Sequence, residues 1–191
     1  MVSDQHTLFQ QLAPFPEGFR YQEELLSSEE ERSLVAQIET LPFREFEFRG
    51  FLGKRRTVSF GWRYDFNVRE LQRADSVPTF LRGLGQKAAK FAGLRPEALQ
   101  HVLVTEYSPG AAIGWHKDRP EFEDVIGISL GIPCVFRFRK QKGRGWGRAS
   151  IELRPRSAYL LRGPPVGTGS TASQPLTSCA IQSPSELCAN A

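Results

Sequence analysis

The chain has 191 residues, of which 40% are apolar and 24% are charged, with a formal net charge of +4. A chain of this length buries about two-thirds of its unfolded surface in one domain, and the composition excludes wholesale disorder. The three cysteines lack the even number and spacing of a disulfide framework. No apolar stretch approaches the roughly 18 residues of a membrane span, so we expect a cytoplasmic protein outside membranes.

Two amphipathic helices are expected in the first half of the chain. The stretch LLSSEEERSLVAQIETLPF offers Ser27 or Ser28 as an N-cap, acidic residues in the first turn and Pro42 as a stop. The stretch SVPTFLRGLGQKAAKFAGL contains Pro78, which suits the first helical position, and Gly93, which suits a C-terminal cap. Both helices are predicted to pack on a sheet.

Short runs separated by turn residues indicate strands from residue 101 onward. The runs are HVLVTEY, DVIGISLG, CVFRFRK, ASIELRP and SAYLLRG. In CVFRFRK the period-two alternation predicts one buried and one exposed face. Several short strands in succession predict an all-β core, a sandwich or small barrel, with flanking helices.

Basic residues cluster in residues 49–56 and 137–148. Such clusters attract phosphates, but a solvated polar surface has the same composition. A phosphate-binding surface and an ordinary solvated surface both stay open as interpretations.

The stretch TEYSPGAAIGWHKDRP places His116 and Asp118 two residues apart behind a glycine-rich turn. In an extended segment, residues i and i+2 point to the same face, so the imidazole and the carboxylate can reach one metal ion. Two histidines and one carboxylate that leave open positions suit a redox-active Fe(II) centre. An H-x-D pair alone is more often a surface pair, and the third ligand has to come from elsewhere.

The stretches VTEYSPGAAIGWHKDRPEFEDVIGISLGIPCVFRFRK and ASIELRPRSAYLLRGP resemble the AlkB-like group of iron- and 2-oxoglutarate-dependent dioxygenases. The resemblance covers residues 15–164, after a tail of residues 1–14. It implies a double-stranded β-helix (jelly roll) with helices outside it, and Fe(II) and 2-oxoglutarate as cofactors. It matches His116 and Asp118 to the first two iron ligands.

The resemblance also implies contacts and a reaction. Tyr107 matches the tyrosine that hydrogen-bonds 2-oxoglutarate, and Thr105 stands where asparagine is common, so a hydroxyl replaces the two groups of an amide. The implied reaction uses O2 and 2-oxoglutarate to hydroxylate a C–H bond. On an N-methylated base of DNA or RNA, the product releases formaldehyde.

The stretch FGWRYDF places Phe60, Trp62, Tyr64 and Phe66 at alternating positions. Enzymes that act on a base take it out of the stack, and aromatic side chains can hold it there. Trp62 and Tyr64 are therefore candidate substrate contacts, with a buried strand as the alternative.

The resemblance calls for a second histidine after YLLRGP and then an R-x5-R pair whose first arginine clamps 2-oxoglutarate. Neither is present. The other histidines, His6 and His101, precede the motif, and His101 at the start of a strand is expected to be structural. Residues 165–191 contain no basic or aromatic residue, so this aberrant tail is expected to be disordered and the jelly roll incomplete at its C-terminus.

The tail predicts a change of reading frame. If residues 167–190 are reverse-translated with suitable third bases and read two bases later, they spell NWEHSIPAVDELRYSITFRTLR and a stop. The missing histidine falls where the codons of Ser170 and Thr171 meet, and RYSITFR is an R-x5-R pair. Because the first two bases of most codons are fixed by the residue present, only one base in each shifted codon is free to fit this reading.

We therefore expect a dioxygenase domain for alkylated nucleic-acid bases, and an inactive chain as written because a ligand and the clamping arginine are missing. The alternative is a non-catalytic nucleic-acid-binding module. A cupin-like metal protein is disfavoured, because its motifs normally need more histidines. The sequence decides neither the substrate nor the oligomeric state.

Overall fold

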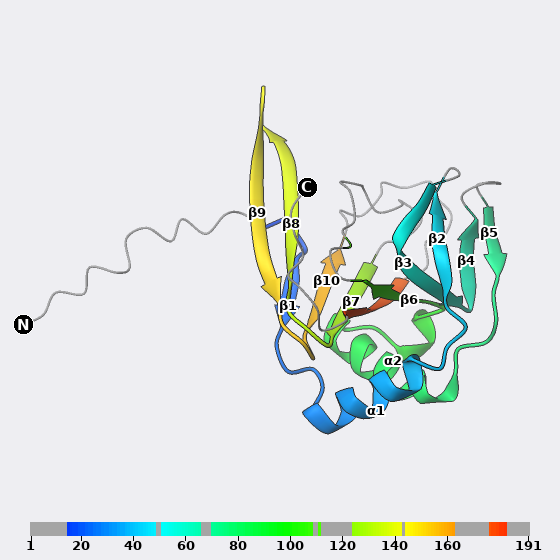
Figure 1. Cartoon of the computed structure of the whole chain (residues 1–191). Helices are drawn as coiled ribbons and strands as arrows, with labels where there is room; N and C mark the ends of the chain where they lie inside the picture. Colours follow the sequence, from blue (N-terminus) through cyan, green and yellow to red (C-terminus); the bar gives the residue numbers. More distant parts are fainter. Residues whose placement is uncertain are drawn as a thin grey trace, which may run out of the picture.

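The computed structural model describes residues 15–48, 51–65, 70–108, 111, 124–142, 144–162 and 176–182. Within these ranges, two α-helices cover one side of a seven-stranded sheet, and a long two-stranded hairpin projects beyond it (Figure 1). The mostly β fold with two helices was predicted and is confirmed. No helix in the described ranges is both long and apolar enough for a membrane span.

The main sheet has the strand order β1-β10-β7-β11-β6-β3-β2. Its neighbours pair antiparallel, except that β11 runs parallel to both β7 and β6. The strands are β1 (Arg20–Gln22), β2 (Arg44–Phe48), β3 (Phe51–Phe60), β6 (His101–Tyr107), β7 (Asp124–Leu130), β10 (Ala158–Arg162) and β11 (Leu176–Gln182).

Two further pairs of strands form small sheets. One contains β4 (Trp62–Asp65) and β5 (Glu70–Arg73), and the other is the hairpin of β8 (Cys134–Lys142) and β9 (Gly145–Leu153). Within the described ranges, β8 therefore has β9 on one edge and no second strand on the other.

Helix α1 (Ser28–Ile38) begins as predicted with Ser27 as the N-cap. The Ser27 hydroxyl accepts a hydrogen bond from the backbone N–H of Glu30 at 3.2 Å, and the Glu30 carboxylate accepts one from the Ser27 N–H at 2.8 Å. This capping box satisfies two donors that would otherwise be left open at the helix start.

Helix α2 (Thr79–Ala92) ends as predicted at Gly93, whose φ of 72° lies in the left-handed region. Its start differs by one residue from the prediction. Pro78 has a ψ of 144° and is the N-cap, so the helical conformation begins at Thr79. A 3-10 turn, η1 (Pro96–Ala98), then leads into β6.

The hydrophobic core lies between the helices and the main sheet. Alternate residues of each central strand point to this side, because side chains alternate across a strand. The largest fully buried members are Ile38, Val104, Ile126, Ile128, Leu130 and Leu160.

Aromatic rings connect the other side of the main sheet to the hairpin. The Phe136 ring lies 4.8 Å from both the Tyr159 ring of β10 and the Phe138 ring, and Phe138 lies 5.1 Å from Phe19. Phe136 and Phe138 are half-buried, whereas Val135, Arg137 and Arg139 are exposed. The alternation predicted for CVFRFRK is confirmed.

An ion pair ties α2 to the sheet. Arg162 of β10 donates to both carboxylate oxygens of Asp124 on β7, at 2.8 and 2.6 Å, and to the carbonyl oxygen of Ala92 at 3.0 Å. The hydrogen bond to Asp124 raises the pKa of Arg162. A bidentate pair of this kind fixes direction as well as distance, so the C-terminal end of α2 is held against two strands.

The C-terminal tail differs in part from its expected disorder, because residues 176–182 form β11. Composition alone predicted no order, but β6 and β7 each present a row of backbone groups to this segment. The pairing satisfies buried N–H and C=O groups that would otherwise lack partners, and that long-range contribution is invisible in the tail's own sequence.

A matched pair of glycine substitutions tests the packing of Tyr159. A Cβ atom at Gly127 would overlap the Tyr159 ring, whereas one at Gly83 in α2 would meet no atom within 4 Å. We expect Gly127→Ala to lower the free energy of unfolding by about 1–3 kcal/mol and Gly83→Ala to raise it by about 0.5–1 kcal/mol. Urea unfolding measures both, and equal effects would contradict this packing.

The buried His101 makes stability depend on pH. Burial lowers its pKa from 6.5 to about 4, so between these values the unfolded chain binds a proton that the folded chain excludes. The contribution of neutral His101 to the free energy of unfolding is therefore complete above about pH 6.5. It falls by on the order of 3 kcal/mol as the pH drops to about 4. In urea unfolding across this range, the free energy of unfolding of His101→Gln is expected to depend less steeply on pH than that of the unmodified chain. An unchanged pH dependence would refute the lowered pKa of His101.

Candidate functional site

Four polar residues of β3 and β6 share the sheet face opposite the helices. Tyr107 is the register partner of Arg55, and Thr105 is the partner of Thr57. The next register pair along these strands is Val58 and Val104, of which Val104 belongs to the helix-side core and Val58 packs against it. Side chains alternate along a strand, so the four polar residues point the other way. Thr105 is buried and Tyr107 is half-buried. We call Arg55, Thr57, Thr105 and Tyr107 the β3–β6 polar patch.

The Arg55 guanidinium gives this patch its positive charge. Its carbon lies 3.9 Å from the centroid of the Phe46 ring, and its partner on β6 is the Tyr107 side chain. Burial lowers the pKa of Arg55, and the hydrogen bond with Tyr107 opposes that shift. A guanidinium beside a hydroxyl on a partly buried surface is suited to binding a carboxylate.

The neighbouring Arg56 has a different environment. Its Nε donates to a carboxylate oxygen of Glu106 at 2.6 Å, and the two side chains form an ion pair. Its charge is therefore offset locally, whereas Arg55 contacts a hydroxyl and an aromatic ring. Sequence reasoning treated both as members of a basic cluster, because only the strand register distinguishes them.

The structure places two of the predicted site residues, Thr105 and Tyr107, on one face of one strand. His116 and Asp118 lie outside the described residues, so their role as metal ligands stays a prediction. In the described ranges, no three side chains of His, Cys, Asp and Glu come together as a metal site.

His101 does not complete a metal site near Tyr107. It lies at the opposite end of β6, and six residues of strand span about 20 Å. The sequence holds only one other histidine outside the H-x-D pair, His6. The second histidine ligand that the resemblance requires after YLLRGP is missing from the sequence, so the residues of the chain do not complete the expected iron site.

The predicted aromatic surface is only partly supported. Phe60 is 5% exposed and belongs to the helix-side core, so it is not a base contact. Gly61, with a φ of 75°, separates it from β4, where Trp62 is half-buried and the Arg73 guanidinium lies 5.7 Å from its ring. The Tyr64 side chain and Phe66 lie outside the described part of the chain.

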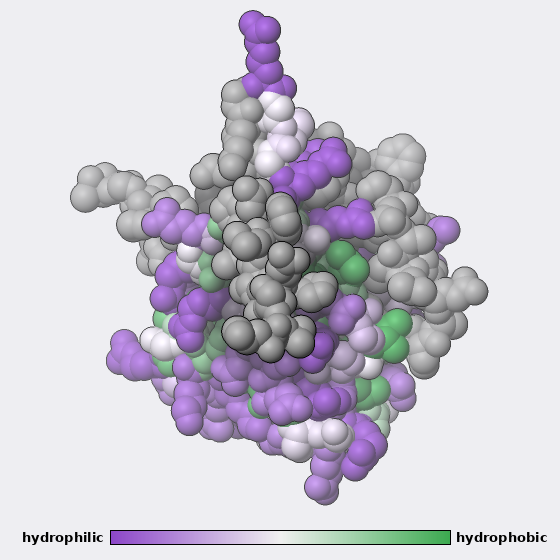
Figure 2. All heavy atoms as spheres, turned by 90° about the vertical axis from the view of Figure 1, so that its left-hand side faces the viewer, coloured by the Kyte–Doolittle hydropathy of each residue, from purple (hydrophilic) through white to green (hydrophobic). Residues whose placement is uncertain are grey.

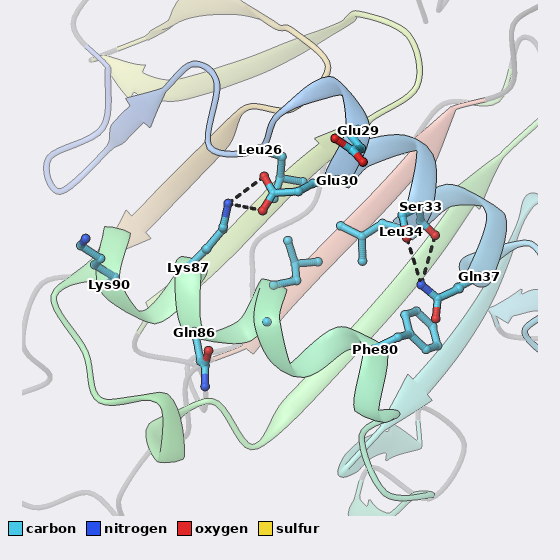
Figure 3. A pocket seen from close by; sticks show the side chains of 12 residues that line it. Leu26, Glu29, Glu30, Ser33, Leu34, Gln37, Phe80, Gln86, Lys87 and Lys90 are labelled. Atoms are coloured by element: carbon cyan, nitrogen blue, oxygen red, sulfur yellow. Dashed lines mark hydrogen bonds and ion pairs between the residues drawn. The ribbon is translucent and has the colours of Figure 1, made fainter.

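An open groove of about 620 Å³ lies between α1 and α2 (Figure 3). Leu34 and Phe80 line it, and Lys87 bridges both oxygens of Glu30 at 2.6 and 2.8 Å. The hydrogen bond from Lys87 lowers the pKa of Glu30. The groove is on the helix side of the sheet, so it is separate from the β3–β6 polar patch.

Comparison with known proteins identifies relatives. Residues 18–165 match the family model of the 2OG-Fe(II) oxygenase superfamily. The chain is 28% identical over 139 residues to a protein of Mus musculus, tRNA (carboxymethyluridine(34)-5-O)-methyltransferase ALKBH8, which covers 69% of this chain and 21% of that protein. The Macaca fascicularis protein of the same name is 26% identical over 155 residues, and the match covers 78% of this chain and 23% of that protein.

The chain thus spans about a fifth of the length of these curated relatives. The solved structure of OsALKBH1 has a TM-score of 0.55 and 14% sequence identity, and the match covers 78% of this chain and 82% of that one. This likeness shows a shared fold and supports the expected double-stranded β-helix. The chain belongs to the 2OG-Fe(II) oxygenase superfamily, in its AlkB-like group.

Proposed function

We propose that this chain carries an AlkB-type dioxygenase domain that oxidatively demethylates alkylated nucleic-acid bases when its C-terminal segment is complete. The observation that carries the proposal is the β3–β6 polar patch, which ends at Tyr107, nine residues before His116 in the range that matches the family. Fe(II) and 2-oxoglutarate are the cofactors of this family.

The residues of the polar patch have defined roles in this proposal. The Tyr107 and Thr105 hydroxyls donate hydrogen bonds to a carboxylate of 2-oxoglutarate. Arg55 orients the Tyr107 hydroxyl and adds positive charge beside it. His116 and Asp118 are the two iron ligands that the chain contributes. Because the third ligand is missing, we assign no reaction step to the chain as written.

The reading-frame hypothesis accounts for the missing ligand. The family match ends at residue 165, where the aberrant tail begins. The codons of residues 176–182 overlap the shifted reading DELRYS, which contains the first arginine of the R-x5-R pair. This segment is also β11, at the centre of the main sheet. We therefore propose residues 15–164 as the domain and 165–191 as its misread end.

A nucleic-acid substrate is supported by two observations. The mouse relative is named as a tRNA methyltransferase, and exposed arginines lie on the β8–β9 hairpin. The missing ligand favours a second candidate, a nucleic-acid-binding module without catalysis. Salt-sensitive binding with no succinate production by either reading frame would favour this candidate.

Restoring the reading frame is expected to restore cofactor binding and turnover. We expect the restored chain to release succinate from 2-oxoglutarate and formaldehyde from methylated oligonucleotides. The written chain is expected to have at least about 100-fold lower activity, because a ligand and a bidentate carboxylate partner are missing. Succinate and formaldehyde assays with both chains measure this.

The control is the restored chain with Asp118→Ala, which removes one predicted iron ligand and leaves the frame intact. It should fall to the level of the written chain. Comparable turnover by the written and restored chains would refute the role assigned to the C-terminal segment. Succinate release without formaldehyde would support 2-oxoglutarate-dependent oxygenase activity but would show that methylated bases are not the substrate.

Tyr107→Phe in the restored chain tests the cofactor contact. Loss of one hydrogen bond to a carboxylate should weaken 2-oxoglutarate binding by about tenfold. Tyr21→Phe is the control, because the Tyr21 hydroxyl accepts a hydrogen bond from the Arg154 N–H at 3.0 Å away from the patch. Titration calorimetry with 2-oxoglutarate should distinguish the two, and equal affinities would remove Tyr107 from the site.

A further inference from the structure

The outer face of the β8–β9 hairpin is strongly basic. Exposed and half-buried residues alternate along β8, and the exposed ones include Arg137 and Arg139. Their register partners on β9 are Ser150 and Arg148, both exposed. We call Arg137, Arg139, Trp146 and Arg148 the hairpin outer face. The opposite face carries Phe136 and Phe138, which pack toward the main sheet.

Two arginines of this face stand directly opposite each other. Arg139 pairs in register with Arg148, and like charges in such cross-strand positions destabilise a sheet. Within the described ranges, Arg137 and Arg148 take part in no ion pair. Glu152 pairs in register with Val135, so it is a diagonal neighbour of Arg137 at about 7–8 Å, but it lies four residues from Arg148, about 13 Å along the strand. The fold therefore leaves positive charge concentrated here, which a polyanion would offset.

Trp146 adds an aromatic surface to this charge. Its side chain is 55% exposed, and the Arg139 guanidinium carbon lies 4.7 Å from the ring centroid. Burying a tryptophan contributes more hydrophobic free energy than burying most other side chains, so an exposed ring beside arginines is suited to a partner. The hairpin projects from the body of the molecule, and its projecting end is hydrophilic (Figures 1 and 2).

We propose that the hairpin outer face binds single-stranded nucleic acid, with the arginines contacting phosphates and Trp146 stacking on an unpaired base. Phosphates match the charge of the face, and stacking requires bases that are not paired within a duplex. The inference rests on the proposed function for the choice of polymer. It adds a binding surface that is separate from the β3–β6 polar patch and needs neither iron nor 2-oxoglutarate.

Two triple variants with the same charge change test the proposal. R137Q/R139Q/R148Q neutralises the hairpin outer face, and R32Q/R82Q/R95Q neutralises three exposed arginines on or next to the helices. Fluorescence anisotropy of the full chain with labelled single-stranded DNA and RNA of about 15 nucleotides, without metal, measures affinity against salt concentration.

We expect the hairpin variant to bind at least about tenfold more weakly and its slope of log affinity against log salt to be shallower by about 2, which corresponds to three lost phosphate contacts. The helix variant should retain the slope of the unmodified chain. Trp146→Ala should weaken binding by about tenfold, whereas Trp146→Phe should retain most of it, because a ring still stacks. The DNA and RNA arms show which backbone the face prefers.

Thermal unfolding of each variant checks that exposed substitutions leave the fold intact. Equal binding by the two triple variants, or unchanged binding by Trp146→Ala, would overturn the proposal. Stronger binding to anionic phosphatidylserine vesicles than to the oligonucleotides would also overturn it. Because the assay contains no iron, loss of base demethylation alone leaves this inference standing, and loss of oligonucleotide binding alone leaves the oxygenase assignment standing.

Discussion

The structure depends on the backbone hydrogen bonds that β11 forms at the centre of the main sheet. β7 is buried along its whole length and β6 along most of it, so unpaired N–H and C=O groups between them would lie away from water and destabilise the fold. Residues 176–182 supply the pairing on both sides. A strand at this position is therefore needed to pair the facing edges of β6 and β7.

The same constraint connects the fold to the proposed chemistry. Under the reading-frame hypothesis, the codons of the segment that closes the sheet belong to the stretch that would encode a histidine and an R-x5-R pair in the other frame. Stability and cofactor binding would then depend on one stretch of sequence. The written tail supplies a short strand of small and β-branched residues, but neither an imidazole nor a guanidinium. It can satisfy backbone groups without completing a metal site.

Local signals in the sequence predicted much of this structure. The Ser27 cap, the Gly93 stop and the alternating faces of β8 follow from propensities and periodicity over a few residues. The position of Arg55 beside Tyr107 could not be predicted, because it depends on the register between two strands about fifty residues apart. Phe60 was assigned to an alternating aromatic surface, but a turn at Gly61 directs it into the core. Local patterns do not contain this information.

We propose that residues 15–164 form an AlkB-like domain whose true C-terminus is written in another frame. Sequencing the genomic DNA and the transcript across the codons of residues 160–191 tests this most directly. We expect third bases that spell NWEHSIPAVDELRYSITFRTLR in the shifted frame. We also expect one small insertion or deletion near GPPVG, either as a natural change in the gene or transcript or as an error in the printed sequence. An intact frame throughout, with codons that cannot yield the shifted reading, would contradict it.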